Sequence, residues 1–585
     1  MAQIEPAHNR QVNLITLSLI AVVIGTVTGL GAVFLRWLIG VIHNLFFLGQ
    51  FASGYDANMP TAESPFGAWV ILAPVIGGAI VVFLVNRFAP EARGHGVPEV
   101  MDAIYFRNGY IRPAVVVIKS LASALSIGSG ASVGREGPII QIGSGIGSVL
   151  GRALHLRHWQ VITMVAAGAG AGIAATFNTP LGAVMFAIEL MLPEFSARTF
   201  LPVVLATGAA TYVGRLIFGN EPAFLVASYN LPDPFVPLSV DMLPLFAILG
   251  VLAGIASWLF VWLLHWLEDR FDAMPYNAYI RNAIGMLFLG VLFYVMMRTT
   301  GMYQTAGVGY ATIQAILNGG ITAAGLLMVL FVAKLLATCI SLASGASGGI
   351  FSPSLFLGAT LGGAFGSTLD AIWPQLGFSP ITFALVGMAG LVGGSTGAAM
   401  TAIMMIFEMT GDYNITLAAI IAVATAIGTR RTLVVENIYT MKLARRGHHV
   451  PRDHRTHMFP IRLATEVMKP VVASVQAADL VRVPATLSDM LPSDMVHVVV
   501  AKGRMIVGMA LVDKNDFTRA YSPIRTNFGI ARENNLLEII LTRMVERGHE
   551  FDLVVKGKGV PRPENVLGVV SHAAITASVL HDYEG

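Results

Sequence analysis

"GSGASVGREGP", residues 128–138, is a run of small and apolar residues that contains two charges, Arg135 and Glu136. Its last ten residues resemble a second stretch, SGASGGIFSP (344–353), which lies far along the chain. Self-similarity of this kind is the signature of an internal repeat. The two stretches are therefore expected to occupy equivalent places in two halves of one fold.

Two further pairs of residues support the repeat. Lys119 and Lys334 precede the two glycine-rich stretches at the same distance, and Glu189 in FAIELM corresponds to Glu408 in IFEMT. In transporters, such repeats place the substrate site at their interface near the bilayer midplane, where half-helices begin. The repeat thus directs the search for a functional site to residues that flank the glycine-rich stretches.

The composition indicates that most of the chain lies in a lipid bilayer. Of the 585 residues, 55% are hydrophobic and 12% are charged, and the mean hydropathy is +0.69. These values predict a polytopic membrane protein. The formal charge of +3 is too small to indicate a nucleic-acid partner, and the single cysteine, Cys339, excludes an internal disulfide and a cysteine-based zinc site. The first apolar stretch, 12–48, shows no cleavage site, so we expect an uncleaved membrane helix.

Several later apolar segments are short and are interrupted by proline, as at Pro138, Pro180 and Pro353. Because a straight spanning helix needs about 20 residues, these segments predict broken or partly spanning helices. The strings AAGAGAGIAA (166–175) and GATLGGAFGS (358–367) favour close packing of helices in lipid over flexible loops.

The chain is expected to have four parts, because its character changes near residue 445 from apolar to polar and basic. They are a cytoplasmic N-terminus (1–12), a transmembrane domain (13–445), a linker (446–462) and a cytoplasmic domain (463–585).

The two glycine-rich stretches have the features of an anion site. Each precedes a proline that is tolerated in a first helical turn, so each is predicted to be a loop that leads into a helix N-terminus. Unpaired backbone N–H groups and the helix dipole favour an anion at such a place. A charge at the centre of a membrane costs about 2.5–3.5 kcal/mol. We therefore expect the Glu136 carboxylate to occupy the anion site as a gate, with the alternative that Glu136 only pairs with Arg135 in a surface loop.

Four separated motifs resemble those of the CLC family of chloride channels and proton/chloride exchangers. They are GHGVPE (94–99), GREGP (134–138), GGIFSP (348–353) and the segment around Tyr439. The resemblance runs from about residue 15 to 445. It implies an all-α polytopic membrane protein whose two inverted, internally repeated halves contain about eighteen helices. It also implies a homodimer in the lipid bilayer with a separate pore for chloride and other small anions in each subunit.

The resemblance assigns roles to individual residues. Glu136 is similar to the gating glutamate of the family, and Lys119 to a lysine that raises the positive potential around the pore. The backbone of the two loops and the Tyr439 hydroxyl would hold the anion. The residues expected to bind anions are His95, Gly96, Val97, Arg135, Gly137, Gly349, Ile350, Phe351 and Tyr439.

One departure from the family pattern concerns the inner anion site. The family usually has serine where this chain has His95. A histidine N–H can donate to an anion, but its size and titration change the selectivity and pH response of the pore. Alternatively, His95 turns aside and leaves coordination to the backbone of Gly96 and Val97.

A second departure concerns protons. Exchangers of the family usually carry a proton-transferring glutamate at the position of Leu190, after a structural glutamate that corresponds to Glu189. Because leucine carries no proton, this departure favours a passive chloride channel gated by Glu136. The alternative is a proton/chloride exchanger with a non-standard proton route through water, His95 or Glu189.

The C-terminal part resembles a degenerate pair of CBS modules, with motifs such as TEVMKPVV (465–472) and NVLGVVSHAAI (565–575). Asp513 and Asp516 could approximate an adenine-nucleotide site, but a dimerisation domain without a ligand is the favoured interpretation. No cofactor is expected beyond chloride as a bound ion.

Basic residues after the last apolar segment predict cytoplasmic N- and C-termini, by the positive-inside rule. The expected uncleaved start and the absence of organellar targeting features favour a bacterial inner membrane. The histidines of the linker could bind a metal, although a solvated basic collar is the favoured interpretation and no metal site is predicted. These histidines are His448, His449, His454 and His457.

A different class of function is an intramembrane enzyme that uses Glu136 as a general base, or a glycine-rich nucleotide site. The sequence lacks the nucleophile and partner residues that the first needs, and the strand and acidic residue that the second needs. Anion transport is the interpretation that accounts for the repeat.

Overall fold

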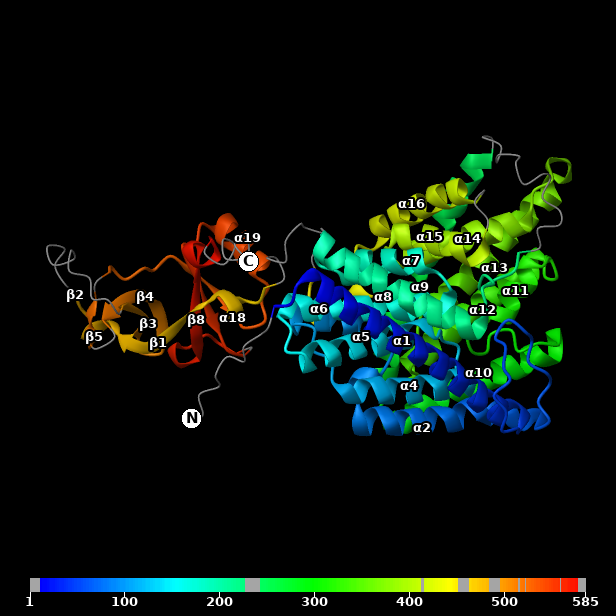
Figure 1. The fold of residues 1–585 in the computed structure, drawn as a ribbon, viewed down its shortest axis with the longest axis horizontal. Coiled ribbons are helices and arrows are strands. Elements are labelled where there is room, and N and C mark those ends of the chain that lie inside the picture. The colour runs from blue at the N-terminus through cyan, green and yellow to red at the C-terminus, as the bar shows by residue number, and fades with distance from the viewer. Residues whose placement is uncertain are drawn as a thin grey trace. The chain divides into compact units, whose positions relative to one another are not determined.

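The computed structural model describes residues 11–226, 242–411, 415–450, 462–482, 495–513, 516–520, 522–557 and 559–576. The chain divides into two compact units, Met1–Arg452 and Asp453–Gly585 (Figure 1). The division falls inside the linker that the sequence predicts at 446–462.

The first unit is helical, and its helices fall into two series that follow the same order. Both series begin with a helix of 30 residues. The first series is α1 (Leu14–His43), α2 (Ala73–Phe88), α3 (Val97–Phe106), α4 (Pro113–Gly128), α5 (Glu136–Ala153), α6 (His158–Phe177), α7 (Pro180–Phe186) with its π-helical continuation η4 (Ala187–Met191), and α8 (Ala197–Phe218). The second series is α9 (Leu243–Asp272), α10 (Ala278–Thr300), α11 (Tyr310–Leu317), α12 (Ala324–Ala343), α13 (Phe351–Ile372), α14 (Pro380–Thr396), α15 (Ala399–Thr410) and α16 (Thr416–Leu433), and the short α17 (Thr440–Arg445) follows.

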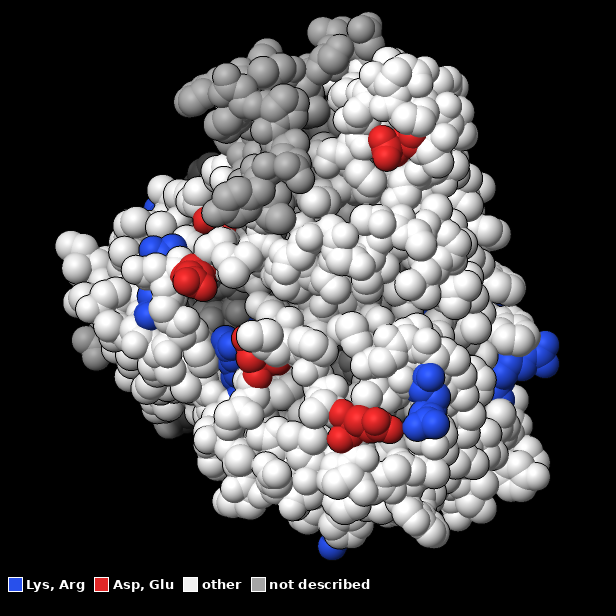
Figure 2. Space-filling view, turned by 90° about the vertical axis from the view of Figure 1, so that its right-hand side faces the viewer, with Lys and Arg blue, Asp and Glu red and all other residues white. Residues whose placement is uncertain are grey.

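Within the described residues, nine helices are long and apolar enough to cross a membrane, and four more are apolar but shorter. The shorter helices are Pro113–Gly128, Pro180–Met191, Pro380–Thr396 and Ala399–Thr410. Short helices were expected from the prolines and glycines. Pro180 does lie in one of these shorter helices, whereas Pro353 lies in α13, which is long enough to cross a membrane. Figure 2 shows a face on which charged side chains are few and most of the described surface is uncharged, in keeping with the apolar composition.

The two glycine-rich stretches lead into equivalent helices. α5 begins at Glu136 and α13 begins at Phe351, and Pro138 and Pro353 each lie in the first turn. A proline is tolerated there because its missing N–H would have no partner within the helix. The prediction of two loops that each deliver a helix N-terminus is therefore confirmed.

The two loops contact each other directly. The Gly134 amide donates to the Gly349 carbonyl at 2.7 Å, and the Gly349 amide donates to the Gly134 carbonyl at 2.6 Å. Because these glycines hold the same position in the two copies of the motif, the reciprocal pair lies where the halves meet. The starts of α5 and α13 are thereby fixed side by side.

The small-residue strings serve close helix packing, as expected. A Cβ atom on Gly143 of α5 would lie 2.2 Å from the Gly168 carbonyl oxygen of α6. In the second half, a Cβ atom on Gly358 of α13 would lie 2.4 Å from the Gly387 carbonyl oxygen of α14. Only glycine permits such backbone approach, which is how helices associate in lipid.

The second unit is a small α/β domain around one mixed sheet of eight strands in the order β2-β5-β4-β3-β1-β8-β7-β6. Its helices are α18 (Ala464–Val467) and α19 (Leu537–Arg547), and buried side chains of α19 pack with those of β7 and β8. The strands are β1 (Lys469–Gln476), β2 (Val481–Arg482), β3 (Met495–Lys502), β4 (Met505–Asp513), β5 (Asp516–Ala520), β6 (Phe528–Arg532), β7 (Phe551–Val555) and β8 (Val566–Ser571). This mixture of strands and helices agrees with a CBS-like domain.

Candidate anion pathway

Glu136 is buried at the first position of α5, with 1% of its surface exposed. Its Oε2 accepts a hydrogen bond from the Ser352 amide at 3.3 Å, and its Oε1 accepts one from the Tyr310 hydroxyl at 2.6 Å. The Ser352 hydroxyl also donates to Oε1. Ser352 lies in the first turn of α13, where backbone N–H groups have no partner within the helix. The carboxylate therefore faces one backbone amide and two hydroxyl groups at the helix N-terminus of the other half, and the two hydroxyl oxygens lie 2.7 Å from each other.

The interpretation of Glu136 as one half of a surface ion pair is not supported. No ion pair between Glu136 and Arg135 is present among the described residues. Instead, the Arg135 guanidinium lies over the Tyr310 ring, 5.1 Å from its centroid. The positive charge is near the carboxylate but leaves both of its oxygens to Tyr310 and Ser352.

Tyr310 and Ser352 were not among the predicted site residues. Ser352 lies inside GGIFSP, one residue after the predicted Phe351. Tyr310 ends the motif GVGY (307–310) and begins α11, just as Val97 ends the motif GHGV (94–97) and begins α3. The two motifs correspond, and their second glycines, Gly309 and Gly96, both have a φ of +81°. A search for this weaker repeat would have indicated Tyr310 as a site residue.

Two buried lysines hold these equivalent loops. Lys119 donates to the carbonyls of Ala92 and Gly94 at 2.9 and 2.7 Å. Lys334 donates in the same way to two carbonyls of the second loop, those of Thr305 and Gly307, at 3.1 and 2.9 Å. Each ammonium group is 0% exposed and has no carboxylate within ion-pair distance among the described residues. The two lysines therefore brace the two loops in the same way, through backbone carbonyl groups.

His95 and Tyr439 come together, although they are far apart in the sequence. Their ring centroids are 5.9 Å apart, and each side chain is 1% exposed. Both ring nitrogens of His95 are buried without a hydrogen-bond partner among the described residues. A buried polar group without a partner costs about 1–3 kcal/mol. An anion or a water beside the ring would remove that cost.

The backbone around His95 is tightly constrained. A Cβ atom on Gly137 would lie 2.1 Å from the His95 carbonyl oxygen and 2.9 Å from the Gly349 Cα atom. The structure thus brings Gly137, Gly349 and the His95 loop together.

Two predicted anion donors are already engaged. The Val97 amide donates to the His95 carbonyl at 3.0 Å, and the Gly349 amide donates to Gly134. Neither amide is free for an anion in this state. Of the other predicted positions, Ile350 and Phe351 are buried directly before and at the start of α13.

The two elements that carry His95 and Tyr439 are joined by ion pairs. Glu99 of α3 pairs with Arg446 at 2.7 Å and with Lys442 of α17 at 3.4 Å. Hydrogen bonding to Glu99 raises the pKa of Arg446, so this contact stays ionised. The buried Asp102 accepts from His448 at 2.6 Å, so a histidine of the linker has a side-chain partner on α3.

Leu190 and Glu189 lie where α7 continues as a π-helix. Leu190 is buried and has no titratable group. The Glu189 carboxylate accepts from the Met400 and Thr401 amides at 2.9 and 2.8 Å and from the Thr401 hydroxyl at 2.6 Å, all at the start of α15. A carboxylate held in this way caps a helix.

Glu408 shows that this capping role is duplicated. Its carboxylate accepts from the Leu181 and Gly182 amides at the start of α7, at 3.0 and 2.7 Å. Each half therefore supplies the acceptor for a helix N-terminus of the other half. Glu189 matches the structural role expected from the family and is a poor candidate for carrying protons.

In the C-terminal unit, Asp513 ends β4 and Asp516 begins β5, and the two residues are paired across this antiparallel turn. Asp516 also forms an ion pair with Arg519 at 3.3 Å. The nucleotide site that these residues suggest stays a prediction. Of the linker histidines, His454 and His457 lie outside the described residues, within which no group of three or more potential metal ligands is present.

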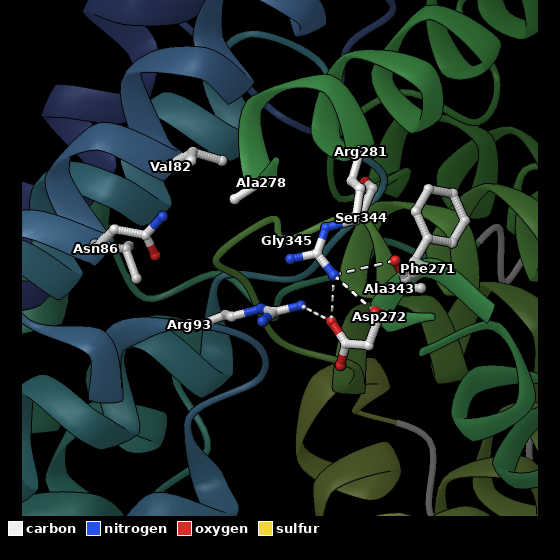
Figure 3. Close-up of a pocket in the computed structure, with 11 residues that line it drawn as sticks. Val82, Asn86, Arg93, Phe271, Asp272, Ala278, Arg281, Ala343, Ser344 and Gly345 are labelled. Carbon is white, nitrogen blue, oxygen red and sulfur yellow. Dashed lines mark hydrogen bonds and ion pairs between the residues drawn. The ribbon is translucent and has the colours of Figure 1, made fainter. Parts of the chain in front are cut away.

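One cavity near the loops is closed by charges (Figure 3). Arg93 and Arg281 both point toward Asp272 and pair with its Oδ1 at 3.2 and 3.1 Å. The cavity has a volume of about 30 Å³. Since one water needs roughly 10–15 Å³, this space fits water alone. The contact braces the residue before Gly94 rather than forming a ligand site.

Comparisons with known proteins agree on one family. The profile described as voltage gated chloride channel matches residues 77–431. The H(+)/Cl(-) exchange transporter ClcA of Vibrio cholerae serotype O1 is 35% identical over 375 residues, which are 62% of this chain and 76% of the relative.

Two solved structures are also similar. A slow cyanobacterial Cl-/H+ antiporter matches with a TM-score of 0.64 and 26% identity, over 74% of this chain and 98% of that chain. A eukaryotic CLC transporter shares the fold with a TM-score of 0.62 at 20% identity, over 96% of this chain and 98% of its own.

Proposed function

Because the chain belongs to the CLC family of voltage gated chloride channels, we propose that it exchanges chloride for protons across the membrane. The chain is a multi-span membrane protein of an anion-transporting family. The exchange reaction is supported by the relatives that are named H(+)/Cl(-) exchange transporters. These relatives favour a proton/chloride exchanger over the passive channel that Leu190 suggested in the sequence.

The observation that carries the proposal is the position of the Glu136 carboxylate against one backbone amide and two hydroxyl groups that can donate to it. The Ser352 amide, the Ser352 hydroxyl and the Tyr310 hydroxyl suit a chloride ion as well as a carboxylate. A chloride and an ionised Glu136 therefore compete for one site. Protonation removes the negative charge that these donors stabilise, which releases the side chain and opens the site to an anion.

This competition couples the two ions when the proton reaches Glu136 from the inner side. Leu190 offers no proton carrier, and Glu189 is held by the start of α15. His95 is the remaining candidate, because its ring nitrogens are buried without partners beside Tyr439. We infer that His95, with water, takes the place of the missing glutamate on the proton route, since an imidazole can accept a proton at one ring nitrogen and release one from the other.

The test is the proton-to-chloride ratio of purified protein in liposomes. An outward chloride gradient is expected to drive protons inward against their own gradient, with a fixed ratio at different gradients. Chloride flux without proton movement would contradict exchange and support the second candidate, a passive channel, which Leu190 favours. The absence of any chloride flux would contradict both.

Substitution of His95 by serine tests the proton route. Serine restores the residue usual in the family and keeps a hydroxyl donor for the anion, but it carries no proton near neutral pH. We expect His95→Ser to keep chloride flux within about threefold of the unsubstituted protein and to lower proton flux by at least about tenfold, as expected for a lost proton carrier. Unchanged coupling in this variant would overturn the route through His95 without affecting the exchange proposal.

We also propose, from family membership, a homodimer in an inner membrane with both termini in the cytoplasm. The basic residues that follow α16 support this orientation. For the C-terminal domain we propose a dimerisation role without a required cofactor. An adenine nucleotide at Asp513 and Asp516 is the less favoured alternative.

A further inference from the structure

A second polar cavity lies beside the start of α5, outside the contacts of Glu136. Its volume is about 180 Å³. Its walls come from α1, α6 and α8, from Arg135 directly before α5, and from connecting residues at 56–58, 178, 219 and 221–223. The polar side chains that line it are Arg36, Asp56, Asn58, Arg135, Thr176, Asn178, Thr211, Arg215 and Glu221.

The cavity lies at one end of the membrane unit. At the opposite end, the start of α1 is joined to the start of α6, because the Gln160 side chain exchanges hydrogen bonds with the Val12 backbone at 2.8 and 3.4 Å. The cavity is lined by residues of the other ends of these helices, such as Arg36 on α1 and Phe177 on α6. With the proposed cytoplasmic N-terminus, the cavity faces the outside.

Three guanidinium groups line the cavity, and none has a carboxylate within ion-pair distance among the described residues. The Arg36 guanidinium lies over the Phe218 ring at 4.2 Å, and Arg135 lies over Tyr310. Ring stacking occupies the faces of these groups and leaves the N–H donors at their edges available.

The guanidinium groups differ in how many of their N–H donors have a hydrogen-bond partner. The Arg135 Nε atom is buried without a hydrogen-bond partner in the part of the chain that the structure describes. Arg215 is exposed and uses its Nε to donate to Asn178 Oδ1 at 2.6 Å, which fixes the group at the cavity wall. Asp56 and Glu221, both exposed, contribute negative charge, so the three arginines outnumber the carboxylates.

The size and donor type indicate a ligand other than a halide. The cavity, at about 180 Å³, is more than ten times larger than the roughly 10–15 Å³ that one water needs. A guanidinium edge matches two oxygens of a carboxylate, sulfonate or phosphate group, which gives a paired geometry that a spherical ion cannot use. An anion with several oxygens therefore fits the site better than chloride.

We propose that this cavity is a separate external binding site for polyatomic oxyanions, with Arg36, Arg135 and Arg215 as its charged ligands. The assignment of the outer side rests on the proposed function, but the binding itself does not. Because Arg135 directly precedes Glu136 and stacks on Tyr310, a bound oxyanion lies next to the gating carboxylate. It would obstruct the outer route of chloride.

The test measures binding of methanesulfonate, which stays ionised throughout the pH range of the protein. Sodium methanesulfonate is titrated into the detergent-solubilised full-length protein by isothermal calorimetry at constant chloride. We expect saturable binding, and a Kd about tenfold higher in Arg36→Gln, as expected when one charge-assisted contact worth about 1.4 kcal/mol is lost. Arg36→Lys keeps the positive charge but lacks the paired N–H donors of the guanidinium edge, so an intermediate Kd is expected.

Arg298→Gln is the matched control, because Arg298 lies near the end of α10, is exposed and pairs with Glu63 at 3.5 Å outside the cavity. Its Kd is expected to match that of the unsubstituted protein. If Arg36→Gln does not elute as a folded protein, Arg215→Gln carries the test, because Arg215 is exposed.

Equal Kd values in the unsubstituted, Arg36→Gln and Arg215→Gln proteins, or the absence of saturable binding, would overturn the site. An equal fall in affinity in Arg298→Gln would also overturn it, since surface charge alone would then account for binding. Failure of the transport proposal appears separately, as the absence of proton-coupled chloride flux with binding intact.

Discussion

Replacement of Glu136 by glutamine is expected to raise chloride flux and to abolish its dependence on external pH. Glutamine has no negative charge, and its N–H₂ group cannot replace the carboxylate oxygen that accepts from the Ser352 amide, because both groups are donors. The site would then be left to chloride at every pH. In the unsubstituted protein, flux is expected to rise as the external pH falls, because protonation of Glu136 releases its carboxylate.

Chloride efflux and proton uptake of Glu136→Gln in liposomes between pH 4.5 and 7.5 measure both effects. We expect proton movement to disappear, since the variant has no group that alternates with chloride. Glu63→Gln is a suitable control, because Glu63 is exposed and pairs with Arg298. Glu136→Gln that keeps the pH profile of the unsubstituted protein would refute the gating role.

Replacement of Gly137 by alanine is expected to abolish transport through backbone displacement. The new Cβ atom would lie 2.1 Å from the His95 carbonyl oxygen and 2.9 Å from the Gly349 Cα atom. Both neighbours are backbone, so neither can rotate away. Overpacking costs about 1–3 kcal/mol even where side chains can adjust. The loop that carries His95 must therefore shift away from the start of α5.

Chloride flux per folded protein and the thermal unfolding midpoint measure this effect. Gly325→Ala is the matched control, because a Cβ atom on Gly325 near the start of α12 has no neighbour within 4 Å. We expect the control to transport normally. If Gly137→Ala transports as well as Gly325→Ala, the close contact between the two loops is not needed for the pathway.

Local sequence patterns predicted the main parts of the site. The composition indicated the membrane, and the glycine-rich stretches before Pro138 and Pro353 indicated two helix N-termini. These features are local, because a proline in a first turn and small residues in a loop act on the backbone around them. A carboxylate at Glu136 needs a partner in lipid, which marked it as functional before any fold was known.

Other parts of the site depend on which segments meet. Tyr310 reaches Glu136 from α11, and the Glu189 carboxylate caps α15 in the other half. The sequence around these residues does not predict which residues they contact. For Glu189 this mattered, since the sequence left open a proton-carrying role that its three hydrogen bonds make unsuitable.

By itself, the sequence determined a duplicated membrane protein with two loops that offer backbone donors, and one carboxylate beside them. Only the tertiary structure decided that Gly134 and Gly349 bind each other, that Ser352 and Tyr310 hold Glu136, and that Arg36 and Arg215 share a cavity. The reason is physical. Periodicity and composition act through the nearby backbone and the solvent, whereas these contacts are set by how helices far apart in the chain pack in three dimensions.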